Sequence, residues 1–356
     1  MTKLAHNLNA PLVSIVVVSH DRPNYLPAAL DSIVAQSYPN FEILVIDNPS
    51  SSSDEIRKIV SRYNRARLIR NSANLGFTGA MNRGIEEAKG VFIYCTLDDL
   101  VLHRDCIATF VEHAQGHPES GLLSGILFNE DGETIRCAGG IYALAPVFRR
   151  TIIGSGERDC GQFSEAYQVN YVPGGMIFAQ TELLRRLGGF RRQFFMYSED
   201  TDLCARVTKA GRAITIVPQA KAFVSDAPHA FTHKGIAFHK VKNLFTLYLI
   251  HARLRVLPEF YLRYGVVNFL RALKSDRALV WPMIKASAWF VMNAPAFIKE
   301  RYTTSVSVPG AVATGFRCDL KETRPRFDPV ATTTPRGLPA RGPRPARGTD
   351  TVFLRS

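Results

Sequence analysis

The first hundred residues alternate between short apolar runs and amphipathic stretches. Continuous apolar runs at Val13–Val18 and Phe41–Ile46 are typical of strands that are buried on both faces of a sheet. Apolar residues at helical spacing follow the first run, at Leu26, Leu30 and Ile33. Strands that alternate with helices predict βαβ units and a mostly parallel sheet. We therefore expect an α/β fold, with helices on both faces of the sheet.

Polar residues follow three of the expected strands. Ser19–Arg22 come after the first strand, Asp47 ends the second, and Asp98 and Asp99 come shortly after a further strand at Val91–Thr96. In open α/β sheets, ligands bind beyond the carboxyl ends of the strands. Carboxylates at three such ends therefore predict a binding site at this edge of the sheet.

The pattern changes from about residue 120 onward. Short strands and glycine-rich turns follow, including an expected strand at Val169–Phe178 that is interrupted by Gly174 and Gly175. Glu199–Ala210 has the spacing of a helix, and residues 238–303 are helical and basic. Residues 304–356 are rich in Thr, Pro, Gly and Arg, which predicts disorder. We expect a first domain at residues 1–237 with halves at about 1–118 and 119–237, then the helical region and the tail.

The formal net charge is +13, and the whole excess lies at one end of the chain. Residues 1–237 carry 24 basic and 24 acidic side chains, whereas residues 238–356 carry 20 basic and 7 acidic ones. A basic end predicts an anionic surface as a partner. Its charges are interleaved with an apolar stripe at Leu244, Leu247, Ile250 and Leu254, and no nucleic-acid-binding motif accompanies them. We therefore expect attachment to an anionic membrane surface and no binding to nucleic acid.

The cysteine pattern and the hydropathy of the chain predict that the protein is cytoplasmic. The six cysteines are scattered without a C-x-x-C pair, which argues against a zinc cluster and a disulfide scaffold and favours reduced cytoplasmic thiols. The start of the chain does not predict a signal peptide, and no segment reaches the roughly 17–25 apolar residues of a spanning helix. We expect a cytoplasmic protein that is peripheral on the inner face of the cell membrane.

Four segments, in this order and spacing, resemble glycosyltransferase family 2, especially its rhamnosyl- and galactofuranosyltransferase-like branches. They are Val13–Arg22 with Leu30–Ile33, Phe41–Asn48, Asn74–Gly84 and Gly188–Asp202, and the resemblance covers roughly residues 12–255. It implies a GT-A fold whose first half binds a nucleotide-sugar donor and whose second half binds the acceptor. The implied acceptor is a glycan or lipid-linked glycan of cell-surface polysaccharide synthesis.

The resemblance also implies which residues bind the donor. Asp47 would accept a hydrogen bond from the pyrimidine base of a UDP- or dTDP-sugar. An alternative is that Asp47 only begins a turn, because Asp-Asn-Pro is common in turns. The other implied donor residues are Ser19, His20, Asp21, Arg22, Asn74, Gly76, Phe77, Asn82, Arg83 and Asp98.

A metal site is implied after the fourth strand. Asp99 matches the metal-binding position of the family, where Mg²⁺ or Mn²⁺ would neutralise the donor diphosphate, and Asp98 is a second ligand candidate. Leu97 stands where the family usually has an acidic or amide residue. The family often has a histidine after the last strand, where this chain has Val224, and His229 is a nearby substitute. An alternative is that these carboxylates only cap a helix or line a loop.

The acidic pair at Glu199 and Asp200 is the implied catalytic centre. Asp200 matches the family's general base, with Glu199 as the fallback, and an inverting transfer needs such a base to take the proton of the acceptor hydroxyl. Both residues also suit the start of a helix, which leaves a structural role open. Asp202 is expected to be structural. Gly174 and Gly175 match a small-residue segment near the acceptor.

Two other functions compete with a metal-dependent inverting transferase. A sugar nucleotidyltransferase would need a glycine-rich basic loop directly after the first strand, and Ser19–Arg22 is not glycine-rich. A non-catalytic or weakened homologue that only binds a nucleotide sugar or glycan stays open, because Leu97 and Val224 depart from the family pattern. Release of nucleotide from a sugar donor separates this alternative from the enzyme.

Overall fold

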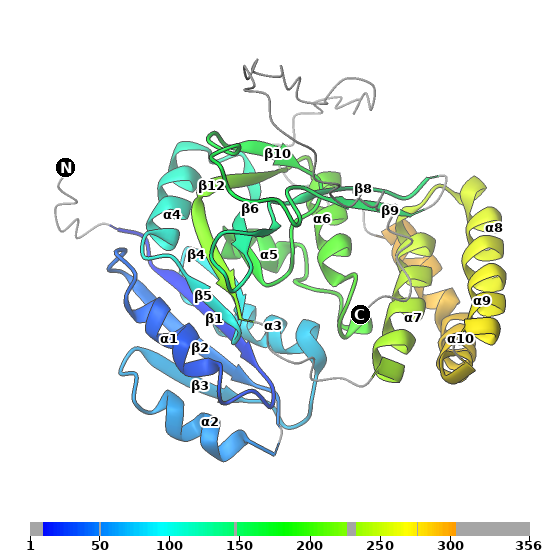
Figure 1. Cartoon of the computed structure of the whole chain (residues 1–356), viewed down its shortest axis with the longest axis horizontal. Helices are drawn as coiled ribbons and strands as arrows, with labels where there is room; N and C mark the ends of the chain where they lie inside the picture. The colour runs from blue at the N-terminus through cyan, green and yellow to red at the C-terminus, as the bar shows by residue number, and fades with distance from the viewer. Residues whose placement is uncertain (1–9, 50, 146–147, 226–232, 276, 304–356) are drawn as a thin grey trace, which may run out of the picture. The chain divides into compact units, whose positions relative to one another are not determined.

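The computed structural model describes residues 10–49, 51–145, 148–225, 233–275 and 277–303. Figure 1 shows a sheet with helices on both faces, followed by further helices at the end of the described chain. The tail that we expect to be disordered, residues 304–356, lies outside the described residues, and so does His229.

One mixed sheet of ten strands forms the centre of the fold. Its strands are β1 (Val13–Ser19), β2 (Phe41–Asp47), β3 (Ala66–Arg70), β4 (Phe92–Leu97), β5 (Leu100–Leu102), β6 (Ser120–Phe128), β7 (Ile135–Cys137), β10 (Tyr167–Val169), β11 (Met176–Gln180) and β12 (Ala213–Val224). Their order is β10-β12-β6-β11-β4-β1-β2-β3, with β5 beside β12 and β7 beside β6. The predicted parallel arrangement is confirmed for β3, β2, β1 and β4. The carboxyl ends of β1, β2 and β4 therefore lie at one edge of the sheet. Next to β4, β11 runs antiparallel.

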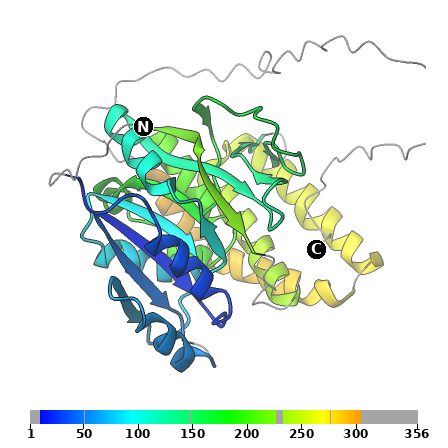
Figure 2. The same cartoon turned by 60° about the vertical axis from the view of Figure 1, so that its left-hand side comes forward.

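Helices cover both faces of this sheet (Figures 1 and 2). They are α1 (Leu26–Val34), α2 (Ser53–Val60), α3 (Gly76–Glu87), α4 (Cys106–Gly116), α5 (Thr181–Arg186) and α6 (Glu199–Lys209). Alternate side chains of a strand point to opposite faces. In β1, Val13, Ile15 and Val17 accordingly pack with α1, α2 and α4 in one core, whereas Val16 and Val18 pack with α3, α5 and α6 in the other.

The expected single strand at Val169–Phe178 is wrong. The segment forms two strands, because the Pro-Gly-Gly sequence between them makes a turn in which the Met176 amide donates to the carbonyl of Pro173 at 3.1 Å. β10 pairs with β12 at the edge of the sheet, whereas β11 pairs with β4 in its middle. The turn with Gly174 and Gly175 therefore comes close to the end of β4.

A separate hairpin and the C-terminal helices complete the described chain. The hairpin consists of β8 (Gly140–Ala143) and β9 (Arg149–Ile152). The helices are α7 (His233–His251), α8 (Leu257–Phe260), α9 (Asn268–Ser275) and α10 (Val280–Thr303), with shorter turns η1 (Arg192–Phe194), η2 (Leu254–Val256), η3 (Tyr261–Val267) and η4 (Arg277–Leu279). None of the helices in the described ranges is long and apolar enough to span a membrane.

The predicted apolar stripe of the C-terminal region is confirmed in part. Leu244, Leu247 and Ile250 are buried. Leu254 is exposed, because α7 ends at His251 and the stripe does not continue on one helix.

Candidate active site

The ends of β1 and β4 bring four predicted donor and metal residues together. The Ser19 hydroxyl donates a hydrogen bond to Oδ2 of Asp98 at 2.8 Å. Nη1 of Arg22 donates to Oδ2 of Asp99 at 2.6 Å and lies 3.8 Å from Oδ1 of Asp98. The guanidinium thus holds two carboxylates from the end of β4 against the loop that follows β1.

Burial sets the protonation of Asp98. Its side chain is almost completely buried, and this burial, assisted by the negative charge of Asp99, raises the pKa of Asp98 to about 7. The hydrogen bond from Ser19 and the charge of Arg22 oppose that rise. A further cation beside these oxygens would favour the ionised form. The pair therefore has the oxygen ligands that a divalent metal ion prefers, and binding of an ion would favour the ionised form of Asp98.

Asp47 ends β2 with a fully buried carboxylate. Nε of Arg70 donates to its Oδ2 at 3.0 Å, whereas Oδ1 has no hydrogen-bond partner in the described part of the chain. Burial raises the pKa of Asp47, although Ser53 and Arg70 act in the opposite direction. An unsatisfied buried acceptor costs about 1–3 kcal/mol, so an N–H group of a ligand would bind there favourably. Sequence analysis missed Arg70, because one charged residue at a strand end carries no distinguishing signal.

A hydrogen-bond chain joins the loop after β1 to the start of α3. Nδ1 of His20 donates to the Asn48 carbonyl at 3.1 Å, and Nδ2 of Asn74 donates to Nε2 of His20 at 3.1 Å. Since a carbonyl can only accept, this pattern assigns the proton of a neutral imidazole to Nδ1. Oδ1 of Asn74 accepts from the amide of Gly76 at 2.8 Å. The predicted residues His20, Asn74 and Gly76 therefore form one connected unit.

The start of α3 meets the loop before α6. Gly76 has φ +67°, and a Cβ there would lie 2.5 Å from the Phe195 carbonyl oxygen, so a side chain does not fit. A Cβ on Gly174 would lie 3.3 Å from the ring of Phe77 and 3.6 Å from Oε1 of Glu199. Gly174 thus connects the donor side of the site to the acidic pair. Gly175, the next residue in the turn, packs against the end of β4 instead.

Gly175 faces the end of β4. A Cβ on Gly175 would lie 3.1 Å from Leu97 and 3.3 Å from Leu100. Leu97, which replaces the usual polar residue of the family, therefore packs against this turn. That contact gives the apolar replacement a structural role.

Glu199 and Asp200 begin α6 and differ in their contacts. Oε2 of the buried Glu199 has no hydrogen-bond partner among the described residues, and burial together with the charge of Asp200 raises the pKa of Glu199 to about 8. Asp200 accepts from the Tyr171 hydroxyl at 2.7 Å through Oδ2 and from the Thr201 amide at 2.6 Å through Oδ1. At neutral pH, Glu199 therefore holds a proton, whereas Asp200 is arranged as an acceptor. Sequence analysis missed Tyr171, which comes from the loop after β10.

The segment that leads into α6 has an unusual backbone. Phe195, Tyr197 and Ser198 have φ values of +63°, +69° and +66°. Residues other than glycine rarely adopt such angles, which cost of the order of 1–3 kcal/mol each in sparsely populated regions. Asn243 of α7 supports the segment by donating to three of its carbonyl groups. Strained backbone that is held in this way is common where a site must be kept in a fixed geometry.

Two predicted donor residues are engaged elsewhere. The side-chain amide of Asn82 donates to the carbonyl of Phe190 at 2.6 Å and accepts from its amide at 2.7 Å. Arg83 pairs with Glu87 at 2.8 Å and lies 3.8 Å from Glu86, both on its own helix. These are contacts within the protein, and the donor roles of both residues stay predictions. Asn82 fixes the segment before α6, and Arg83 lies along the solvent side of α3.

Asp21, another predicted donor residue, bonds to the segment that leads into α2. It has φ +57°, and its Oδ1 accepts from the hydroxyls of Ser51 and Ser52 at 2.9 and 2.8 Å. These hydrogen bonds lower the pKa of Asp21, Ser52 having the larger effect. Asp21 therefore joins the loop after β1 to the start of α2, and its donor role stays a prediction.

Asp202 is structural, as predicted. Its fully buried carboxylate accepts from Arg206 at 2.8 Å and from His251 at 2.7 Å, and it also pairs with Arg191. Although burial opposes it, the charge of Arg206, the hydrogen bond with His251 and the charge of Arg191 hold the pKa of Asp202 well below its ordinary value. Arg191 follows the glycines before α6, where the family usually has acidic residues. That departure places a cation between Asp202 of α6 and Glu300 of α10, which lies 3.0 Å from Nε of Arg191.

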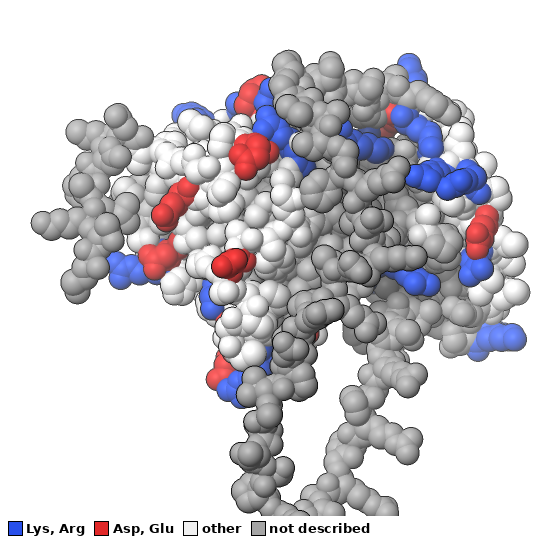
Figure 3. All heavy atoms as spheres, turned by 90° about the horizontal axis from the view of Figure 1, so that it is seen from above, with Lys and Arg blue, Asp and Glu red and all other residues white. Residues whose placement is uncertain are grey.

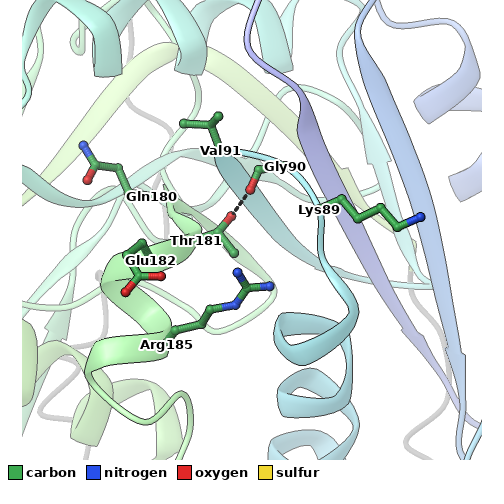
Figure 4. Close-up of a pocket in the computed structure, with 7 residues that line it drawn as sticks. All are labelled: Lys89, Gly90, Val91, Gln180, Thr181, Glu182 and Arg185. Carbon is green, nitrogen blue, oxygen red and sulfur yellow. Dashed lines mark hydrogen bonds between the residues drawn. The ribbon is translucent and has the colours of Figure 1, made fainter.

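A separate hollow of about 270 Å³ lies at the opposite end of β4 (Figure 4). Gly90 and Val91 line it where β4 begins, and Thr181, Glu182 and Arg185 line it from α5. The Thr181 hydroxyl donates to the Gly90 carbonyl at 2.7 Å across this hollow. The candidate active site follows the end of β4, so the two features are distinct.

Comparison with known proteins agrees with this geometry. Residues 14–160 match the family model described as glycosyl transferase family 2. The N-acetylglucosaminyl-diphospho-decaprenol L-rhamnosyltransferase of Mycobacterium tuberculosis is 26% identical over 230 residues, which cover 59% of this chain and 75% of that protein. The amylovoran biosynthesis glycosyltransferase AmsB of Erwinia amylovora is 25% identical over 222 residues, with coverage of 59% and 68%.

The matched family model and these relatives support a glycosyltransferase of family 2. Its fold is also similar to that of GalNAc-T7, solved with UDP, GalNAc and Mn²⁺, at a TM-score of 0.52 and 15% identity, covering 81% of this chain and 59% of that one. S. aureus TarS 1-349 in complex with UDP gives a TM-score of 0.50 at 15% identity, with coverage of 82% and 88%. These likenesses confirm the predicted GT-A fold of this glycosyltransferase.

Proposed function

We propose that this glycosyltransferase moves a sugar from a UDP- or dTDP-sugar to a lipid-linked glycan, with inversion at the anomeric carbon. The observation that carries the proposal is the position of the Glu199–Asp200 pair. A Cβ on Gly174 would lie 3.3 Å from the ring of Phe77 and 3.6 Å from Oε1 of Glu199, so this turn lies between the acidic pair and a predicted donor residue at the start of α3. The relatives from Mycobacterium tuberculosis and Erwinia amylovora support an acceptor of cell-surface polysaccharide synthesis.

The proposed reaction is a single displacement. The acceptor hydroxyl gives its proton to Asp200 while its oxygen forms a bond to the anomeric carbon. The bond from that carbon to the diphosphate oxygen breaks, and the nucleoside diphosphate leaves with the electron pair. Tyr171 donates to Asp200 and thereby orients the carboxylate. The protonated Glu199 stabilises the sugar by a hydrogen bond from its side chain.

Asp98 and Asp99 fit a divalent metal ion. Their oxygens are of the kind that Mg²⁺ and Mn²⁺ prefer, and Arg22 already places one positive charge beside them. No cluster of three or more His, Cys, Asp or Glu side chains occurs within the described ranges, so the donor diphosphate and water would supply the other ligands. When bound, the ion neutralises the charge of the leaving diphosphate.

Asp47 is the proposed contact for the nucleotide base. Its free Oδ1 is suited to the imide N–H of uracil or thymine, and Arg70 holds the carboxylate in place. Asp47→Ala should therefore weaken the binding of UDP more than it slows the turnover of a bound donor. Tighter binding of a purine diphosphate than of UDP or dTDP to the unchanged protein would contradict this assignment.

The alternative is a homologue that binds a nucleotide sugar or glycan without transfer. A panel of nucleotide sugars tests the difference through the nucleotide that is released with and without short-chain lipid-linked sugars. The proposal expects release from a UDP- or dTDP-sugar that the acceptor accelerates, and loss of this release in Asp200→Asn. Binding of UDP without release from any donor would favour the alternative.

The proposed organisation has a donor half at about residues 1–118 and an acceptor half at about 119–237. A basic helical region at 238–303 follows, with a proposed disordered tail at 304–356.

Many large exposed apolar side chains belong to the helical region, namely Leu254, Leu262, Val266, Val267, Leu270, Leu273, Trp281, Ile284, Val291, Met292 and Ile298. Figure 3 shows more Lys and Arg than Asp and Glu at the right-hand edge, where α8 and α9 lie. This combination supports peripheral attachment to the inner face of the cell membrane.

A further inference from the structure

Arg150 of β9 contacts Tyr171, and the same tyrosine contacts Asp200 of the acidic pair. Its guanidinium carbon is 4.7 Å from the centroid of the Tyr171 ring. The hydroxyl of the same tyrosine donates to Oδ2 of Asp200 at 2.7 Å. The hairpin is tied to the C-terminal helices as well, because the Tyr264 hydroxyl donates to the Phe148 carbonyl at 3.2 Å. A cation on the hairpin is thereby fixed beside the proposed base.

The charge of Arg150 is not used by an ion pair. The side chain is half-buried, and no carboxylate in the described part of the chain comes within 4 Å of its guanidinium nitrogens. Burial acts to lower the pKa of Arg150, but Tyr171, Asp200, Cys137 and Glu199 together raise it, so the group stays positively charged. A half-buried guanidinium with this environment can offer its N–H groups to an anion.

A second cation approaches from α7. Lys240 is exposed, and its Nζ lies 5.4 Å from the centroid of the Tyr197 ring, in the segment that leads into Glu199. Burial lowers the pKa of Lys240, and the positive charge of Arg150 lowers it further. The two cations therefore belong to one positive region beside the acidic pair, on elements that follow the donor half.

The proposed binding site of the donor diphosphate does not include Arg150 and Lys240. Its proposed partners Asp98, Asp99 and Arg22 lie at the ends of β1 and β4. Arg150 instead contacts Tyr171, which comes from the loop between β10 and β11. An anion held at Arg150 would thus sit on the acceptor side of Asp200.

We infer that Arg150, assisted by Lys240, binds a phosphate group of the acceptor and so brings the acceptor hydroxyl to Asp200. The inference rests on the proposed function and specifies its acceptor, which would carry a phosphate or diphosphate close to the sugar that is modified. Guanidinium groups bind phosphate through two parallel hydrogen bonds, so Arg150 selects for this group as well as attracting it.

Two synthetic probes test the inference in the full-length protein. One is N-acetylglucosamine joined by a diphosphate to a ten-carbon alkyl chain, and the other has a neutral ether in place of the diphosphate. Binding is measured by calorimetry with saturating UDP, so that the donor site is filled. The unchanged protein should bind the diphosphate probe about ten-fold or more tightly than the neutral one, as expected for charge-assisted hydrogen bonds.

Arg150→Gln should remove most of this preference, Arg150→Lys should restore part of it, and Lys240→Gln should reduce it. The matched control is Arg149→Gln, because Arg149 is the exposed neighbour on the opposite side of the same strand. Hydrolysis of the donor without acceptor should be unchanged in the Arg149→Gln control. An unchanged preference in Arg150→Gln, or no preference in the unchanged protein, would overturn the inference.

A role for Arg150 in merely holding Tyr171 and Asp200 predicts a different result. Arg150→Gln would then weaken both probes alike and lower donor hydrolysis with them, which would also overturn the inference. A different result would contradict the proposed function while leaving this inference intact. A chain that binds the diphosphate probe through Arg150 but transfers no sugar would contradict only the proposed function.

Discussion

The side-chain amide of Asn243 donates a hydrogen bond at 2.6 Å to the carbonyl of Tyr197, two residues before Glu199. The same nitrogen reaches the carbonyls of Phe194 at 2.8 Å and Met196 at 2.6 Å. The neighbouring Lys242 donates to the Gln193 carbonyl. A helix of the C-terminal region therefore holds the strained segment that presents the acidic pair. We therefore expect α7 to support the geometry of the proposed catalytic pair.

Asn243→Ala should lower kcat while leaving the KM for the donor nearly unchanged. The substitution leaves three carbonyls without this donor, and the positive φ angles of the segment are then less firmly held. Asn293→Ala in α10 is the control, because Asn293 bonds only to the carbonyl of Trp289 in its own helix among the contacts described. Steady-state kinetics with both substrates measures the effect. Equal losses in the two variants would show that Asn243 has no special role.

The choice of base is tested by two amide substitutions. Asp200→Asn keeps the shape of the side chain but cannot take the acceptor proton, so transfer should fall by roughly 10²–10⁴-fold. Binding of UDP should persist in both variants. Glu199→Gln should retain more activity, because Glu199 is protonated at neutral pH and the amide also donates a hydrogen bond. A nearly normal Asp200→Asn together with an inactive Glu199→Gln would assign the base to Glu199.

Glu199→Gln should also stabilise the protein at alkaline pH. The pKa of Glu199 is raised to about 8 in the fold, whereas an unfolded glutamate loses its proton near pH 4.3. The folded state therefore binds an extra proton between these values, so the stability of the unchanged protein falls as the pH rises from about 4.3 to about 8. The Tm difference between variant and parent should grow over this range. Glu182→Gln, at an exposed position of α5, should show no such growth.

Metal dependence is tested at Asp99. Chelation should abolish transfer and Mn²⁺ or Mg²⁺ should restore it, while Asp99→Asn should need a higher metal concentration because one anionic ligand is lost. Asp105→Asn, an exposed carboxylate just before α4, is the control. Full activity of the unchanged protein in excess chelator would remove the metal from the proposed mechanism.

The sequence predicts those parts of the site that are local in the chain. Apolar runs followed by polar residues identify β1, β2 and β4, and their parallel direction follows from the helices that connect them. Asp98 and Asp99 are therefore placed correctly at the end of β4. Glu199 and Asp200 are recognised because they begin a helix in a segment that resembles the family.

Parts of the site that come from distant elements could not be predicted in this way. Tyr171 contacts Asp200, and Arg150 contacts Tyr171, only because the tertiary fold brings the β10–β11 loop and the β8–β9 hairpin next to the start of α6. Asn243 lies in a helix whose periodicity indicates packing and gives no sign of a polar contact. Conversely, Asn82 lies in a family-like motif, yet its amide is fully used by Phe190, which only the tertiary structure reveals.

The last prediction concerns the membrane and uses the full chain, because α7 supports the active site and cannot simply be deleted. Trp281 and Met292 on α10 are 61% and 73% exposed, and Lys285 lies 5.4 Å from the Trp281 ring. Replacing Trp281 and Met292 by Ser should weaken binding to anionic vesicles, because apolar side chains at the interface are lost. Lys274→Gln with Lys285→Gln should weaken it by about ten-fold or more, since each basic residue near an anionic leaflet contributes about 1 kcal/mol. Val34→Ser, at an exposed position of α1, is the control.

Flotation with anionic and neutral liposomes measures the binding of these variants, which should also fall with added salt. Equal binding of the unchanged protein to both lipid types, or binding to neither, would contradict peripheral attachment through these helices.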